Sequence, residues 1–92
     1  MMPAPLTDHA RVRMQQRGIP PAALDVLLEY GREAHDHHGC RIVRFDKRSR
    51  QRAARALGRA YRGFERYLDA YAVLASDDAV VTVGHRCGRR AR

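Results

Sequence analysis

The chain of 92 residues contains no tryptophan, and its aromatic residues are limited to two phenylalanines and four tyrosines. A buried core must therefore be built mostly from leucine, valine, isoleucine and alanine. Lysine is nearly absent as well, because 17 of the 18 basic residues are arginine and only Lys47 is lysine. Such a composition can reflect a GC-rich genome, but arginine also binds phosphate oxygens better than lysine does, because its guanidinium group can donate two parallel hydrogen bonds.

Cysteine is scarce, and long apolar runs are missing. Cys40 and Cys87 are the only cysteines, which makes a disulfide scaffold improbable and favours a reducing compartment. No apolar run approaches the roughly 20 residues of a membrane span, and the N-terminus lacks the apolar core of a signal peptide. We therefore expect a cytoplasmic protein with no membrane partner.

Length and charge limit the class of protein further. A chain of 92 residues fits one domain. We expect a disordered N-terminus at residues 1–5, a single domain at residues 6–86 and a basic tail at residues 87–92. The net charge of +8, from 18 basic and 10 acidic residues, favours an anionic partner, of which nucleic acid is the usual one.

Two helices are expected at the start of the domain. The first begins at a cap formed by Thr7 or Asp8 and ends near Arg17, because Gly18 stops it. The second covers residues 22–30 and presents leucines on one face.

A third helix is expected over Lys47–Leu57, ending at Gly58 or continuing to Gly63. Its small and apolar residues define an inward face, and its outward face carries Arg48, Arg52, Arg55 and Arg59. We expect Arg52 and Arg55 to contact RNA phosphates, whereas the ordinary alternative is a solvated helix face.

Four strands are expected, and they fall into two consecutive pairs along the chain. The expected strands cover residues 33–37, 40–46, 68–75 and 79–85. Turns at His38-Gly39 and at residues 76–78 predict antiparallel pairing within each pair. The sequence thus predicts an α+β fold of order ααββαββ, with two N-terminal helices packed on a twisted antiparallel sheet.

Two groups of basic side chains suggest a functional site. His9, Arg13 and Arg17 follow at i, i+4 and i+8, close to one stripe of the first helix. His85 and Arg86 stand where the last strand ends, a frequent position for function. The ordinary alternatives are a solvated helix face and a capping histidine that is hydrogen-bonded to backbone.

These residue types suit metal-independent cleavage of RNA, in which the 2′-hydroxyl is the nucleophile. His9 and His85 would serve as general base and acid in either order, because histidine titrates in the right range. Arg13, Arg17 and Arg86 would stabilise charge on the phosphate. Glycoside hydrolysis fits badly, since no close pair of carboxylates is evident.

Residues 35–40 read HDHHGC, and their histidine and cysteine side chains are all potential zinc ligands. The spacing matches no standard zinc site, so we expect a polar turn and neither a metal nor a cofactor. A zinc-dependent structural module remains the third alternative.

The sequence resembles the bacterial domain-of-unknown-function family 4258 over nearly its whole length. The resemblance is carried by His9, Ala10, Arg13, Met14, Arg17, Gly18 and Ile19, together with Thr82, Val83, His85 and Arg86. That family is usually grouped with the RelE-like small ribonucleases and toxins. The resemblance implies a compact α+β fold, RNA as the substrate class and a possible antitoxin partner.

The chain differs from the ribosome-dependent toxins by the helix expected between its hairpins. We therefore expect an RNA-binding, RelE-like domain that acts as a metal-independent ribonuclease of the toxin type. The alternative is a non-catalytic module that binds nucleic acid or a protein such as an antitoxin.

Overall fold

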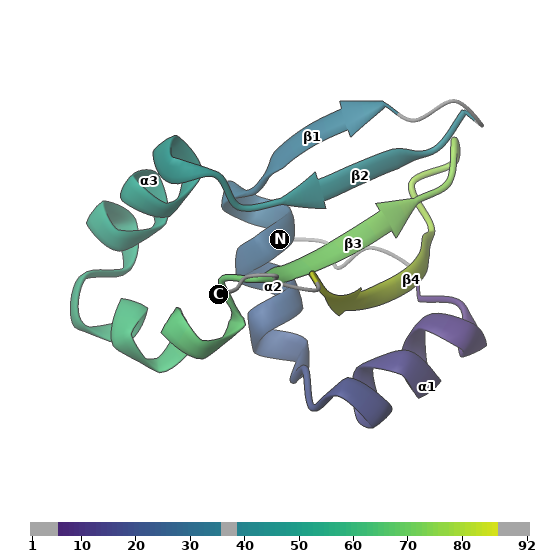
Figure 1. Cartoon of the computed structure of the whole chain (residues 1–92), viewed down its shortest axis with the longest axis horizontal. Coiled ribbons are helices and arrows are strands. Elements are labelled where there is room, and N and C mark those ends of the chain that lie inside the picture. The colour runs from purple at the N-terminus through teal and green to yellow at the C-terminus, as the bar shows by residue number, and fades with distance from the viewer. Residues whose placement is uncertain (1–5, 36–38, 87–92) are drawn as a thin grey trace.

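In the computed structural model, residues 6–35 and 39–86 are described, and they form three α-helices, one 3-10 helix and four strands. The elements in order are α1 (Asp8–Arg17), α2 (Pro21–Tyr30), β1 (Arg32–His35), β2 (Arg41–Arg44), α3 (Lys47–Leu57), η1 (Gly58–Tyr67), β3 (Ala70–Leu74) and β4 (Val80–His85). The strands make one antiparallel sheet of order β1-β2-β3-β4 (Figure 1).

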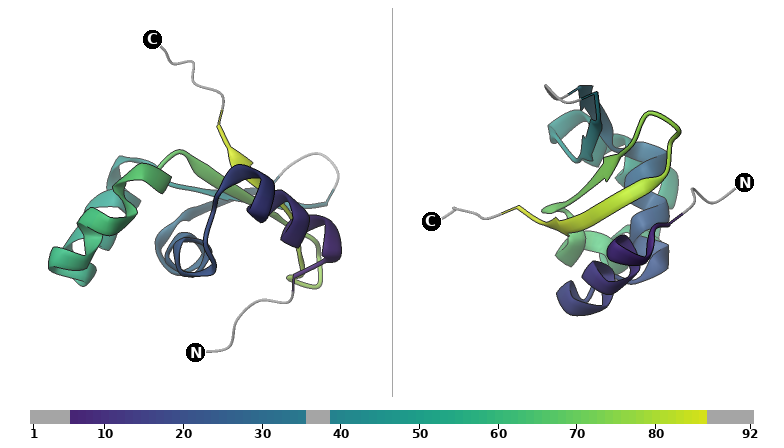
Figure 2. Two further views of the ribbon diagram at one scale, coloured as in Figure 1. Left: turned by 90° about the horizontal axis from the view of Figure 1, so that it is seen from below. Right: turned by 90° about the vertical axis from the view of Figure 1, so that its right-hand side faces the viewer.

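The helices lie on one face of the sheet and around its border. Helix α2 packs behind the sheet against β2 and β3, and α1 packs along β4 (Figures 1 and 2). Helix α3 and η1 pack on each other beside the ends of β2 and β3. In the described part of the chain, the other face of the sheet carries no helix (Figure 2).

Local signals account for α1. The Thr7 hydroxyl accepts a hydrogen bond from the backbone N–H of Ala10 at 3.1 Å, which caps the helix start. Gly18 ends the helix in the left-handed region, with φ of 67°, where glycine meets no steric penalty. Ala10 and Met14 are buried, so this short helix presents a narrow apolar stripe to the sheet.

Helix α3 begins with a reciprocal cap. The backbone N–H of Ser49 donates to the Asp46 carboxylate at 2.8 Å, and the N–H of Asp46 donates to the Ser49 hydroxyl at 2.7 Å. Both bonds explain why Ser49, a polar residue, tolerates burial at 1 % exposure. The structure confirms the expected Lys47–Leu57 bounds of this helix, and all four arginines expected on its outward face are exposed, although Arg59 lies in η1 and not in α3.

The 3-10 helix η1 was not expected. It continues directly from α3 for ten residues, which is long for this kind of helix. Its half-buried rings, Tyr61, Phe64 and Tyr67, recur every third residue. This spacing matches the three residues per turn of a 3-10 helix, so all three rings face the core.

The sheet alternates buried and half-buried residues. In β3, Ala70, Ala72 and Leu74 face the helices, whereas Tyr71 and Val73 face the other way. The pairing of β1 with β2 and of β3 with β4 is antiparallel, as expected, and β2 pairs with β3 as well.

The α+β class is thus confirmed, but the element order differs from ααββαββ because η1 follows α3. Strand β1 spans Arg32–His35, and the end of the strand expected at 33–37 lies outside the described residues, as do residues 1–5 and 87–92. No helix in the described ranges is long and apolar enough to cross a membrane.

The two borders of the sheet differ. At β4, Leu6 makes a parallel bridge to Val80, and the backbone N–H of Thr7 donates to the Val80 carbonyl at 3.1 Å. At the other border, all four residues of β1 are exposed.

Candidate nucleic-acid interface

Helix α1 runs alongside β4 in the same direction. At the start of both elements, the Thr7 hydroxyl donates to the Val81 carbonyl at 3.4 Å. At their ends, the imidazole Nε2 of His85 lies 3.0 Å from the carbonyl oxygen of Arg17. These two contacts set the alignment of α1 with β4, and this alignment determines which residues of the predicted site lie close together.

His85 is held by two acceptors. Its Nδ1 lies 2.8 Å from a carboxylate oxygen of Asp69, and its Nε2 faces the Arg17 carbonyl. A carbonyl oxygen can only accept, and an ionised carboxylate can only accept as well. In each contact the imidazole nitrogen is therefore the only possible donor.

This arrangement joins three elements at one corner of the sheet. The interpretation of His85 as a capping histidine, bonded to backbone, describes its Nε2 contact. With both ring nitrogens engaged within the fold, His85 has no nitrogen left for a substrate proton unless a contact breaks. Asp69, which sequence reasoning missed, is its partner from the residue before β3.

His9 lies at the opposite end of α1, in its first turn. Its Nε2 accepts a hydrogen bond from the Arg13 guanidinium Nε at 3.5 Å, and both side chains belong to the exposed side of the helix. Eight residues of α-helix separate His9 from Arg17, which corresponds to about 12 Å along the axis. The structure therefore does not bring His9 and His85 together at one point.

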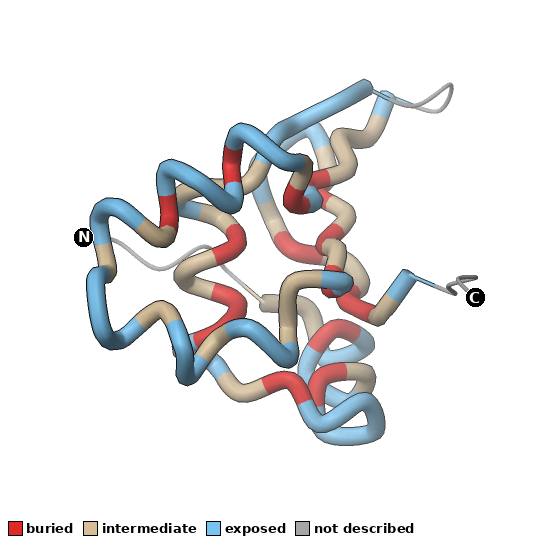
Figure 3. Tube along the Cα trace, turned by 60° about the vertical axis from the view of Figure 1, so that its left-hand side comes forward, coloured by how far each residue is buried: buried red, intermediate tan, exposed pale blue. Residues whose placement is uncertain are grey.

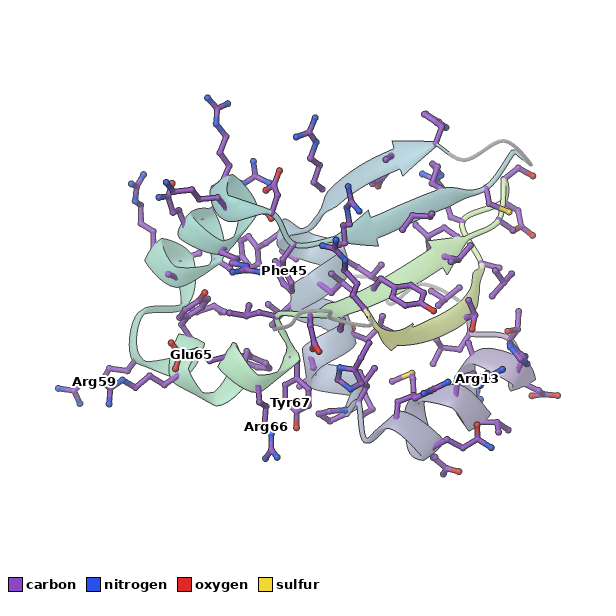
Figure 4. All side chains as sticks on the ribbon, in the orientation of Figure 1. Arg13, Phe45, Arg59, Glu65, Arg66 and Tyr67 are labelled. Atoms are coloured by element: carbon purple, nitrogen blue, oxygen red, sulfur yellow. The ribbon has the colours of Figure 1, made fainter. Side chains whose placement is uncertain are left out.

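The arginines of the predicted site are also divided between the two histidines. Arg17 and Arg86 are exposed beside His85, and the Arg86 backbone N–H donates to the Asp69 carbonyl at 2.7 Å. Arg13 stays with His9, which accepts the hydrogen bond from its guanidinium, and Figure 4 labels Arg13 on α1. The described structure thus gathers Arg17, His85 and Arg86, and leaves His9 and Arg13 apart.

A larger cationic surface lies on the other side of the molecule. We call residues 47–67, which form α3 and η1, the α3–η1 arm. It contains eight basic residues and one acidic residue, Glu65, and so holds seven of the eight net positive charges of the chain. The rest of the sequence is close to neutral, which argues against a uniform compositional bias as the origin of the charge.

All eight basic side chains of the arm are exposed. They are Lys47, Arg48, Arg50, Arg52, Arg55, Arg59, Arg62 and Arg66. Figure 3 shows the exposed positions along both helices, and Figure 4 shows Arg59 and Arg66 projecting outward. None of the eight forms an ion pair with a carboxylate of the described residues.

Two arm arginines do have neighbours within the fold. The Arg52 guanidinium donates to the Tyr30 carbonyl at 2.9 Å, and the Arg66 guanidinium lies 5.8 Å from the centre of the Tyr67 ring. Both contacts leave the positive charge without a counter-ion. Arg52 and Arg55, which the sequence placed in a phosphate-binding role, belong to this surface.

A pocket of about 400 Å³ opens at the base of the arm. It is lined by Gly31, Arg32, Glu33, Asp46, Arg48 and Arg52. Asp46 neutralises part of the positive charge of this pocket, because its carboxylate lies 3.2 Å from the Arg32 guanidinium. The backbone N–H of Ser49, the Ser49 hydroxyl and Arg32 hold the pKa of Asp46 well below its usual range.

The HDHHGC segment contributes no metal centre to the part of the chain that the structure describes. His35 is exposed on β1, whereas His37 and His38 lie outside the described residues. Within those residues, no three metal-ligating side chains come together.

Of the arginines in η1, sequence reasoning named Arg59 but missed Arg62 and Arg66, because it ended the helix at Gly58 or Gly63. Counting charge along residues 47–67 would have found them without any structural assignment. Comparison with protein-family models, with curated proteins and with solved structures found no match to this chain.

Proposed function

We propose that this chain binds RNA and that the α3–η1 arm is its main phosphate-binding surface. One observation carries the proposal: eight exposed basic side chains share a single segment, and none has a carboxylate partner among the described residues. Such a surface gains free energy from a polyanion, because each contacted phosphate releases condensed counterions.

A nucleic acid fits this surface better than a lipid bilayer does. Helices that lie on membranes present a polar face and a large apolar face that enters the lipid. In the arm, the large apolar side chains pack against the protein core instead; they are Leu57, Tyr61, Phe64 and Tyr67. The exposed large hydrophobic residue of the described chain is Val12, on α1, far along the sequence from the arm.

The geometry favours binding over cleavage. A general acid and a general base must both reach the reacting phosphate, but His9 and His85 lie at opposite ends of α1. His85 is also engaged by Asp69 and Arg17. We therefore put the non-catalytic RNA-binding module first, and the metal-independent ribonuclease of toxin type stays a prediction.

The RelE-like assignment belongs to the same proposal. It is supported by two N-terminal helices on an antiparallel sheet and by the clustering of Arg17, His85 and Arg86 at one corner. The 3-10 helix η1 is a departure from the expected order. An antitoxin-like protein partner also remains a prediction.

The experiment is a salt titration of fluorescent RNA binding with two variants of equal charge change. One variant combines Arg55→Gln, Arg59→Gln and Arg62→Gln in the arm. The matched control removes three charges from α1, with Arg11→Gln, Arg13→Gln and Arg17→Gln. All six side chains are on the surface or only partly buried, so both variants should fold.

We expect the arm variant to bind RNA more weakly and to lower the slope of log affinity against log salt by about 2 in magnitude for a single strand. The α1 variant should retain most of the affinity. A larger loss in the α1 variant would move the binding surface to the α1–β4 corner. Absence of RNA binding at low salt, or equal affinity for anionic vesicles, would reject the proposal.

A further inference from the structure

The helix-free face of the sheet is a second surface next to the arm. Strand alternation places Arg44, Tyr71 and Gly84 on this face, because their neighbours Val43, Ala70 and Ala72 are buried on the other. The helices contact the sheet from the opposite side and along β4 (Figures 1 and 2).

The strand register sets these residues in one row. Arg44 stands directly opposite Tyr71, and Tyr71 stands directly opposite Gly84. The same alternation places Arg86, two residues after Gly84, beside this row. An aromatic ring is thus flanked by a cation from each side.

Tyr71 lies across Gly84. A Cβ atom built on Gly84 would come within 3.0 Å of the Tyr71 hydroxyl oxygen and 3.1 Å of its Cζ atom. The glycine therefore provides the space in which the ring rests on the sheet. The Tyr71 hydroxyl forms no hydrogen bond with the described residues, although tyrosine hydroxyls in folded proteins usually find a partner.

The two flanking arginines also lack partners. Arg44 and Arg86 are exposed, and neither side chain forms a hydrogen bond or ion pair within the described ranges. On the same sheet, Arg32 and Arg41 are both paired with carboxylates. The unpaired arginines are thus the two beside Tyr71.

This row is continuous with the arm. Arg44 precedes the first residue of α3 by three positions, and Tyr71 follows the last residue of η1 by four. Two carboxylates lie near the path from the arm to the sheet, and both have partners within the fold: Asp46 is paired with Arg32, and Asp69 with His85.

We infer that the helix-free face of the sheet binds single-stranded RNA, with one base stacked on Tyr71 and the adjoining phosphates on Arg44 and Arg86. The inference rests on the proposed RNA binding and adds the class of RNA to it. A stacked base needs an unpaired nucleotide, because bases in a duplex expose only their edges. A ring between two cations is the arrangement that sequence-tolerant single-strand binding uses.

The test compares a short single-stranded RNA with the same strand annealed to its complement. Three variants are informative: Tyr71→Leu, which keeps apolar bulk over Gly84, Tyr71→Phe, which keeps the ring, and Arg44→Gln. Tyr71→Leu should weaken single-strand binding by roughly 5- to 150-fold while leaving the salt slope and the duplex affinity unchanged. Tyr71→Phe should bind like wild type, and Arg44→Gln should lower the slope by about 0.7.

A second measurement does not depend on how the variants fold. Photo-crosslinking of iodouridine-containing RNA to the wild-type chain should attach the base to the peptide that contains Tyr71. Equal single-strand affinity of wild type and Tyr71→Leu, or crosslinks confined to the arm, would overturn the inference and leave RNA binding intact. If the wild-type chain bound no RNA at all, that result would instead reject the proposed function itself.

Discussion

Gly31 lies against Val43, so that a Cβ atom on Gly31 would come 2.7 Å from the Val43 Cγ1 atom. The same Cβ would be 2.5 Å from the backbone carbonyl oxygen of Leu27. The backbone of Gly31 has φ of −66°, which any residue adopts. Glycine is therefore needed here for space between α2 and the sheet, and not for its conformational freedom.

Gly31→Ala should destabilise the fold by roughly 1–3 kcal/mol, because Leu27 cannot move its carbonyl without disturbing the end of α2. The measurement is urea unfolding followed by circular dichroism. Gly63→Ala is the matched control, since a Cβ there meets nothing within 4 Å. It should leave the free energy of unfolding nearly unchanged, and equal effects of the two substitutions would contradict the steric explanation.

His85→Ala should lower the free energy of unfolding by roughly 0.5–1.5 kcal/mol, because it removes the group that joins the Arg17 carbonyl to the Asp69 carboxylate, and water can solvate both exposed partners. Asp69→Asn should cost less, since an amide oxygen still accepts from the imidazole. A double-mutant cycle between His85 and Asp69 measures their coupling free energy. Additive effects of the two substitutions would show that the 2.8 Å contact contributes nothing to stability.

The lowered pKa of Asp46 predicts how stability depends on pH. A carboxyl group whose pKa is lower in the folded state contributes stability above its usual pKa of about 3.9 and loses it as pH falls below that value. Wild type should therefore lose its advantage over Asp46→Asn as the pH drops from 5 to 2, because asparagine still caps the helix but cannot ionise.

Unfolding of both proteins at several pH values gives this difference directly, and titration of the other carboxyl groups cancels in it. Ser49→Ala is the informative control. It removes one of the donors that lower the pKa, so the pH dependence of its stability should be shallower than that of wild type. A constant difference between wild type and Asp46→Asn across the range would be inconsistent with the proposed cause.

Ribonuclease activity is checked by incubating a generic RNA with the purified chain and a metal chelator. If cleavage occurs, His9→Ala should lower its rate by roughly 100- to 10,000-fold, as expected for a general acid or base. His85→Ala should affect the rate mainly through stability, because both imidazole nitrogens are engaged in the fold. If both variants had normal stability and both lost all ribonuclease activity, the mechanism that pairs the two histidines would be supported again.

Local signals in the sequence were enough to place α1 and α3. The expected cap at Thr7 and the glycines Gly18 and Gly58 act within one helical turn of themselves, whereas the Asp46 cap of α3 was found only in the structure. The antiparallel pairings followed from turn residues for the same reason. These signals do not distinguish the 3-10 helix, because its rings recur every third residue, a spacing close to the i, i+3 and i+4 pattern of an α-helix.

The arrangement of the candidate site could not be predicted in the same way. His85 and Arg17 are 68 positions apart in sequence, and their contact depends on how α1 packs along β4. Helix spacing showed that His9, Arg13 and Arg17 share a stripe, but it did not show which end of that stripe reaches the last strand. Only the tertiary packing of α1 decides that Arg17, and not His9, lies beside His85.

The exposure of β1 has a consequence for self-association. A sheet can grow by adding a strand of another molecule at an unpaired border. The β4 border is partly occupied by Leu6 and Thr7 and lies beside α1. The opposite border offers only four residues, of which Arg32 and Glu33 carry charges engaged with Asp46 and Arg41. A short edge strand that carries charged side chains opposes pairing with a second copy, so the sheet resists growth into a fibre at this border.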